Sequence, residues 1–225
     1  MIDPWKWRGR GASDRTCDTR AKAEALYLVE PLMSQATREA GGSDARLLVG
    51  IACAILQKMV SVVFHQGGDV NNALEVIASW SLSVAEHTDL EAVRNELEKL
   101  LHKCGPEKKS LLMENSEAAT VKLVRDLVSA ALFLDPEWIA LQAPEQSELF
   151  PRAGASTAYF ICYHEAAEVQ SRATRRPFRE IQSVFTNGII RPMLDAAENA
   201  SAAELAAPAS RGSSTNIEVS NQPTA

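Results

Sequence analysis

The segment LLVGIACAILQKMVSVVF, Leu47–Phe64, is the most apolar stretch of the chain and decides its fold class. Gln57, Lys58 and Ser61 are the polar residues that interrupt it. A helix that is apolar on nearly every face is normally buried among other helices. The segment therefore predicts a central buried helix, at about residues 45–65, with other helices packed around it.

The same segment is near the lower length limit for a membrane-spanning helix. The lysine and the glutamine inside it would be costly in lipid. On a helical wheel, one stripe holds small and polar residues, and the opposite stripe holds Leu48, Ile51, Ile55, Met59 and Val62. This pattern is typical of a core helix with one wetter edge, and we expect no membrane span.

Apolar residues recur at helical spacing before and after this segment. The first helix is expected to start near residues 18–19 and to end near Ala40, with Pro31 kinking or splitting it. A third helix is expected after Asp69. A fourth should cover residues 89–103, opened by Thr88 and Glu91 as a capping box.

The second half of the chain continues this pattern. Residues 116–134 read as one helix, and Asp135 followed by Pro136 is a cap and first position for a short helix. Residues 143–156 contain two prolines and a glycine and are expected to form a loop. We expect all-α architecture: an irregular bundle of six to eight helices around the central one.

Thr157–Tyr163 is ambiguous, because its residue types also suit a strand. We interpret residues 157–172 as one helix, since no second strand exists to pair with it. The last helices are expected at residues 177–187 and 189–199, separated at Asn187 and Gly188.

Composition suggests three parts. Residues 1–18 should be a flexible, basic and aromatic N-terminal tail, residues 19–199 a single helical domain, and residues 200–225 a disordered C-terminal tail. The beginning of the sequence shows no apolar stretch of the secretory kind, and the four cysteines form no C-x-x-C pair. We therefore expect reduced thiols and a cytoplasmic protein.

The densest charge cluster comprises Arg172, Arg175, Arg176 and Arg179. Guanidinium groups suit phosphate or carboxylate, so one hypothesis is an anion-binding patch for an acidic partner or a nucleic-acid backbone. The other is a solvated turn whose arginines pair with glutamates such as Glu168 and Glu180, as charge runs usually do.

The N-terminal run interleaves aromatic and basic side chains, which are Trp5, Lys6, Trp7, Arg8 and Arg10. Stacking combined with charge suits single-stranded nucleic acid, and the same composition suits a membrane surface. We favour docking of the tryptophans on the domain, or disorder of the tail, because seven residues are too few to specify a ligand. Contacts of these tail residues with a nucleic acid are the alternative.

Catalytic and metal-binding motifs are not found. The run from His164 to Glu168 lacks the second histidine that a zinc protease helix needs. No phosphate-binding glycine loop or nucleophile elbow occurs. The sequence therefore predicts no catalytic residue, no metal site and no cofactor.

These observations favour a non-enzymatic, cytoplasmic helical protein that acts through protein–protein interaction in a regulatory or adaptor role. The partner is expected to be a protein, with self-association as one option. One alternative is a nucleic-acid-associated accessory protein that uses Arg172–Arg179 and Trp5–Arg10. The net charge of −6 disfavours it, since phosphate affinity is mostly electrostatic. Another is a helical enzyme or small-ligand binder whose site forms only in three dimensions.

Overall fold

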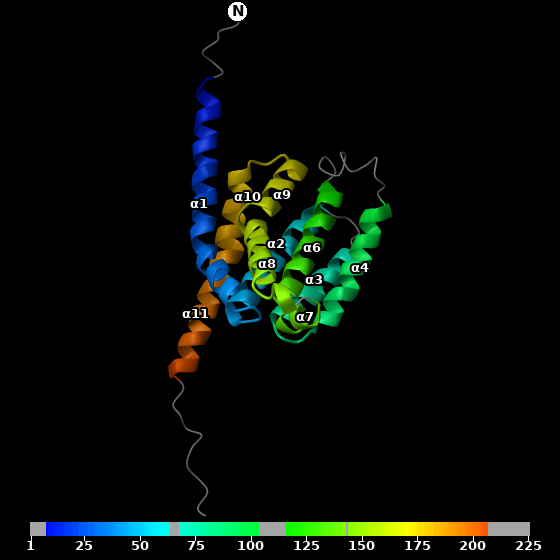
Figure 1. Ribbon diagram of the computed structural model, residues 1–225. Helices are drawn as coiled ribbons and strands as arrows, with labels where there is room; N and C mark the ends of the chain where they lie inside the picture. The colour runs from blue at the N-terminus through cyan, green and yellow to red at the C-terminus, as the bar shows by residue number, and fades with distance from the viewer. Residues whose placement is uncertain (1–7, 64–67, 104–115, 143, 207–225) are drawn as a thin grey trace, which may run out of the picture.

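The computed structural model describes residues 8–63, 68–103, 116–142 and 144–206, and within them every regular element is helical (Figure 1). The elements, in chain order, are α1 (Arg8–Arg38), α2 (Ser43–Val63), α3 (Gly68–Ser81), α4 (His87–Lys103), α6 (Ser116–Phe133), α7 (Pro136–Gln142), the 3₁₀ turn η2 (Pro144–Gln146), α8 (Leu149–Phe160), the π-helical segment η3 (Ile161–Glu165), α9 (Ala166–Thr174), α10 (Phe178–Phe185), the π-helical segment η4 (Thr186–Ile190) and α11 (Arg191–Ala206).

Helix α2 is the centre of the bundle, as its sequence predicted. It packs against α1, α3, α6, α8 and α9. Leu48, Ile51, Ile55 and Met59 are fully buried in a core that continues into these helices. The all-α irregular bundle is therefore confirmed, and Thr157–Tyr163 is helical in α8 and η3.

Helix α2 is also the one helix of the described residues that is long and apolar enough to cross a membrane. Its buried residues face other helices of the bundle. The core helix of a water-soluble bundle has the same length and composition, so this feature does not indicate a span. The absence of a span stays a prediction.

Helix α1 differs from expectation at its start and at its proline. It begins at Arg8 instead of near residues 18–19, and it continues through Pro31 to Arg38 without a break. The apolar stripe runs across the proline, because Val29 lies before it and Ala36 after it and both are fully buried. Packing of this stripe on α2 and α8 offsets the loss of one backbone hydrogen bond.

The loop expected at residues 143–156 is wrong from Leu149 onward, where α8 begins. Pro151 lies in the first turn of α8, where a missing N–H breaks no helical hydrogen bond. Gly154 lets α8 approach α6: a Cβ atom there would stand 2.7 Å from the carbonyl oxygen of Ala130. The glycine therefore serves helix packing, which its sequence neighbours did not indicate.

Two π-helical segments were not predicted. One lies inside the helix expected at residues 157–172, and the other replaces the break expected between the last two helices. Segment η3 links α8 to α9, and η4 runs through Asn187 and Gly188, where a break was expected, into α11. Wider π turns displace backbone carbonyls from their usual partners. The buried side chain of Gln182 donates from Nε2 to the carbonyl oxygen of Cys162 in η3, at 3.4 Å.

The predicted capping box of α4 is displaced. The backbone N–H of Glu86 donates to Oδ2 of Asp89 at 3.2 Å, and the carbonyl of Glu86 accepts the first helical bonds. Glu86 therefore occupies the N-cap position, and Thr88 already lies inside the helix. The residue types near the start of α4 suit an N-cap at Glu86 as well as at Thr88, so the sequence pattern does not decide where the helix begins.

A buried carboxylate closes one end of the bundle. Oδ1 of Asp135 accepts the backbone N–H groups of Glu137 and Trp138 at 3.0 and 2.9 Å, which caps α7 as predicted. Its Oδ2 accepts the indole N–H of Trp80 at 2.9 Å. The guanidinium of Arg46 lies over that indole ring, 4.7 Å from its centroid, and donates to the carbonyl of Trp80.

Gly154 and Gly188 form a matched pair for testing the packing of α8 on α6. Gly154→Ala should lower the free energy of unfolding by about 1 to 3 kcal/mol, because the new methyl group overpacks the helix contact. Gly188→Ala adds a methyl group into open space and should be neutral or stabilising by about 0.5 to 1 kcal/mol. Denaturant unfolding of both variants checks this, and equal losses would contradict the close approach.

Candidate functional site

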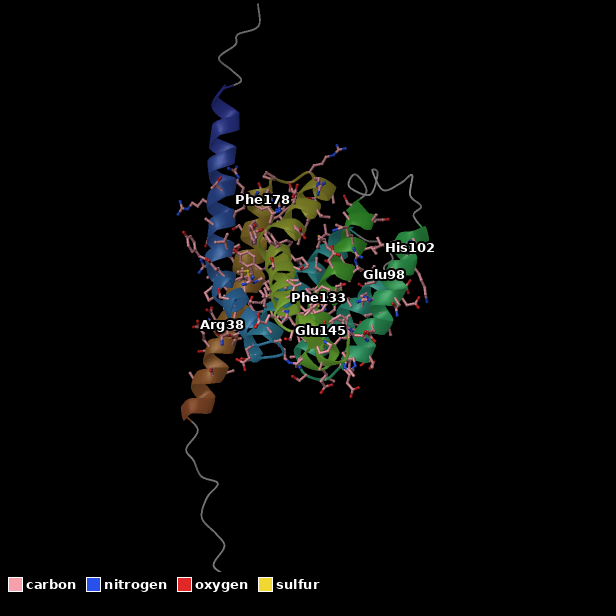
Figure 2. The ribbon with its side chains drawn as sticks, in the orientation of Figure 1. Arg38, Glu98, His102, Phe133, Glu145 and Phe178 are labelled. Atoms are coloured by element: carbon pink, nitrogen blue, oxygen red, sulfur yellow. The ribbon has the colours of Figure 1, made fainter. Side chains whose placement is uncertain are left out.

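A groove of about 640 Å³ lies between α4, α6 and α9, and both apolar and charged side chains line it. It is formed by the C-terminal half of α4, the N-terminal half of α6, the last residue of η3 and α9. Figure 2 shows Glu98 and His102 on the α4 side. The lining residues are Glu98, Leu101, His102, Ala118, Ala119, Lys122, Leu123, Arg125, Glu165, Glu168, Val169 and Arg172.

The groove has an apolar floor and a charged rim. Ala118, Leu123 and Val169 are buried, and they present small or branched apolar side chains. The charged side chains around them include both signs, such as Lys122 and Glu168. A lining of this kind binds apolar surface and fixes its orientation with a few polar contacts.

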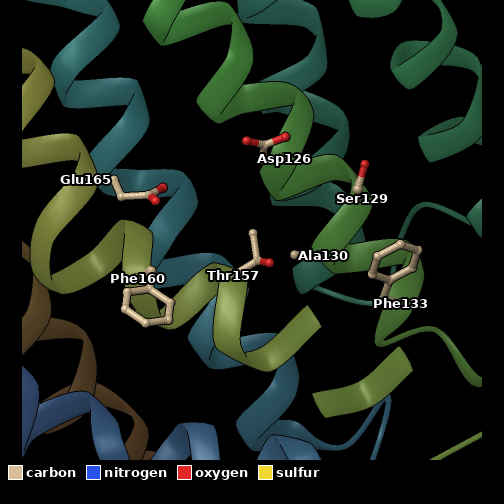
Figure 3. Close-up of a pocket in the computed structure, with 7 residues that line it drawn as sticks. All are labelled: Asp126, Ser129, Ala130, Phe133, Thr157, Phe160 and Glu165. Atoms are coloured by element: carbon tan, nitrogen blue, oxygen red, sulfur yellow. The ribbon is translucent and has the colours of Figure 1, made fainter. Parts of the chain in front are cut away.

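A second hollow, of about 340 Å³, lies between α6 and the end of α8 and shares Glu165 with the groove. Figure 3 shows the carboxyl groups of Asp126 and Glu165 on opposite sides of this hollow, with Thr157 below them. The rings of Phe133 and Phe160 line the same hollow. Glu165 is therefore the residue that connects the two spaces.

Glu165 is an electrostatically perturbed carboxyl. Partial burial raises its pKa above the ordinary value, and the carboxylates of Asp126 and Glu168 add to this, while Lys122 opposes it. It is the last residue of the π-helical segment η3. Shifted carboxyl groups in concave sites are common where ligands bind.

The charges around Glu165 are arranged in pairs. Lys122 Nζ lies 2.8 Å from Oδ2 of Asp126, and Arg125 lies 2.9 Å from its Oδ1. Nδ1 of His164 lies 3.4 Å from Glu168. Burial and nearby Lys22 lower the pKa of His164, so it is mainly neutral at pH 7 and contacts Glu168 as a polar group.

The structure divides the predicted arginine cluster. Arg172 lines the groove and lies 3.9 Å from Glu168, and Arg176 lies 3.4 Å from Glu180. These are the two glutamates expected under the hypothesis of a solvated, paired turn.

The other two arginines lie at the turn between α9 and α10. Arg175 is exposed and ends α9 in a left-handed conformation with φ of 56°. Arg179 is half-buried in the first turn of α10. Three of the four arginines are thus exposed around one turn, and Arg172 is the one that lines the groove. Anion binding by the cluster stays a prediction.

The predicted tail contacts fall at the edge of the structure. Trp5, Lys6 and Trp7 lie outside the described residues. Arg8 and Arg10 belong to the first turn of α1, and their side chains lie outside the described ones.

Two cysteines lie deep in the core. Burial raises the pKa of the Cys53 thiol to about 12, and it raises the pKa of Cys162 further. Both thiols are therefore protonated at neutral pH, and a protonated thiol is a poor nucleophile and metal ligand. Within the described ranges, no group of three histidine, cysteine or acidic side chains is placed to hold a metal ion.

No family model, no curated protein and no solved structure matches the chain.

Sequence reasoning missed the groove because its residues come from three separated segments. The sequence singled out the run from His164 to Glu168 for its resemblance to a metal motif, and Glu165 lies within that run. A half-apolar helix face with two consecutive alanines, Ala118 and Ala119, was the available signal for an open contact surface.

The pKa of Glu165 gives a pH-dependent prediction. A raised pKa in the folded state means that this group favours folding below the ordinary carboxyl pKa of about 4.3, and that the contribution is lost as pH rises through the raised value. Glu165→Gln should therefore change the melting temperature little near pH 4 and raise it near pH 7.

Thermal melts of Glu165→Gln across this pH range check the prediction, with exposed Glu75→Gln as the control that should show no such trend. A variant that loses stability at neutral pH would show that Lys122 holds Glu165 ionised against its burial.

Proposed function

We propose that the protein is a non-enzymatic interaction protein that binds an amphipathic helical segment of a partner protein in the α4–α6–α9 groove. One observation carries this proposal: the apolar floor of the groove is flanked by a charged rim that contains both signs. Amphipathic helices bind grooves of this composition through apolar anchors three and four residues apart.

The shape of the α6 face supports a helix as the occupant. Ala118 and Ala119 are small, and the distance between packed helices depends on the side chains at the contact. Helices α4 and α9 each pack against α6 and lie on either side of this face. A bound helix would lie along α6 between them.

The rim supports selectivity for a partner of mixed charge. Lys122, Arg172 and Glu98 present charges of both signs on the rim, each in an ion pair with a neighbouring side chain of the protein itself. Rim charges mainly affect association rates and partner choice. A second copy of this chain is one partner of this kind, and a cytoplasmic, regulatory or adaptor role remains part of the proposal.

A second candidate is a small-ligand binder or enzyme centred on Glu165. The specific observation in its favour is the shifted carboxyl beside Asp126 and the two phenylalanine rings. Saturable binding of a small molecule that Glu165→Gln abolishes would favour this alternative.

The nucleic-acid alternative is less favoured, because Arg172 and Arg176 already form ion pairs with glutamates. Salt-dependent retention on DNA or RNA, abolished by Arg175→Glu combined with Arg176→Glu, would favour it. Both side chains are exposed, so the melt of the double variant should be close to that of the wild type.

Ala119→Arg tests the proposed groove. The long charged side chain should occupy the face of α6 and reduce capture of the partner by about tenfold or more, with little change in stability because Ala119 is only half-buried. The measurement is a pull-down from native extract with wild type and variant side by side, the recovered protein being identified by mass.

Ala153→Arg is the matched control, because it makes the same change at an exposed position of α8 outside the groove. Capture should be retained in this control. A partner recovered equally well by Ala119→Arg and the wild type would contradict binding in the groove.

A further inference from the structure

A hollow of about 640 Å³ between α1 and α8 shares no residue with the groove. Its lining comes from the last turns of α1 and from Arg152 and Ser156 of α8, and the two helices pack together. Figure 2 labels Arg38 near the C-terminal end of α1. The lining residues are Met33, Ser34, Thr37, Arg38, Arg152 and Ser156.

The charge in this hollow is positive and uncompensated. Arg38 and Arg152 are the charged side chains that line it. Within the part of the chain that the structure describes, neither guanidinium has a carboxylate within ion-pair distance, whereas Arg94, Arg172 and Arg176 each have one. Two unpaired guanidiniums facing one hollow repel each other, and an anion between them removes that repulsion.

The position of Arg152 is not explained by its own helix. It lies in the first turn of α8, where the helix dipole disfavours a cation. Arg38 lies in the last turn of α1, where the dipole favours it. The two guanidiniums therefore come from different helices and different electrostatic settings and share only the hollow.

Hydroxyl groups add hydrogen-bond donors. Ser34 and Ser156 contribute hydroxyls to the lining, whereas the Thr37 hydroxyl already donates to the carbonyl of Met33 at 2.9 Å. Guanidinium forks bind tetrahedral oxyanions in a bidentate way, and serine hydroxyls complete such sites. The volume exceeds that of one oxyanion and falls in the range of small-molecule sites.

From these observations we propose that the Arg38–Arg152 hollow binds the phosphate monoester group of a small organic ligand. The two guanidiniums and the hydroxyls of Ser34 and Ser156 contact the phosphate oxygens. The remaining space, beside Met33, holds the organic part. This site is independent of partner binding in the α4–α6–α9 groove, so either proposal can fail without the other.

The test is a titration of the full chain, followed in ¹H–¹⁵N spectra that include the arginine Nε–H signals, at constant ionic strength. The probes are glucose 6-phosphate, adenosine monophosphate and inorganic phosphate, with glucose as the uncharged comparison. Saturable shifts of the Arg38 and Arg152 signals with at least one monoester, and none with glucose, are expected.

Arg38→Gln and Arg152→Gln should each weaken that binding by about tenfold or more, because each removes charged hydrogen bonds. Arg152→Lys should give an intermediate loss, since lysine keeps the charge without the fork. Arg20→Gln removes one exposed charge from α1 outside the hollow and should change the affinity less than about twofold.

Three results would overturn the proposal. One is the lack of saturable shifts at both arginines with every monoester. Another is an equal loss in Arg20→Gln, which would indicate general attraction of anions. The third is binding to phosphatidylcholine vesicles containing phosphatidic acid, lost in Arg38→Gln, without shifts from the soluble monoesters, which would assign the site to a lipid headgroup.

Discussion

The carboxylate of Asp135 is the contact on which the arrangement of the helices depends. It is buried and accepts three hydrogen bonds, from the indole of Trp80 and from the first backbone N–H groups of α7. A buried carboxylate without such partners would be strongly destabilising. The Asp135 carboxylate therefore fixes the positions of the three groups that donate to it. Trp80 in turn contacts Arg46 of α2. On the other side, the ring of Pro136 packs against Gly41, which has a φ of +74° and no Cβ atom to obstruct the ring.

This closed end explains why the candidate site lies at the other end of α4. The start of α4 is tied to α7, because the indole of Trp138 donates to Oε1 of Glu91 at 2.8 Å. The later residues of α4, such as Leu101, instead line the groove between this helix and α9. The bundle is thus fixed by buried polar contacts at one end and presents an apolar floor with a charged rim toward the other.

Local patterns predicted the parts of the fold that depend on neighbouring residues. The apolar run of α2 and the Asp135–Pro136 start of α7 needed only periodicity and capping chemistry. Gly154 was wrongly predicted to lie in a loop, because it instead allows α8 to approach Ala130 on another helix. The groove and the Arg38–Arg152 hollow were not foreseen for the same reason: each is assembled from helices that are distant in sequence, and single-segment patterns carry no information on such contacts. The arginine cluster was visible by density, yet its pairing with glutamates depended on helix register.

A double-mutant cycle between Trp80 and Asp135 tests the central claim most directly. Trp80→Phe removes the indole donor and Asp135→Asn changes the acceptor, and the free energy of unfolding is measured for each variant and for the pair. Residues that share one buried polar network couple by roughly 1 to 3 kcal/mol, and a coupling of this size is the predicted result. Losses that add to within about 0.5 kcal/mol would show that the two groups act independently and would contradict the role given to Asp135.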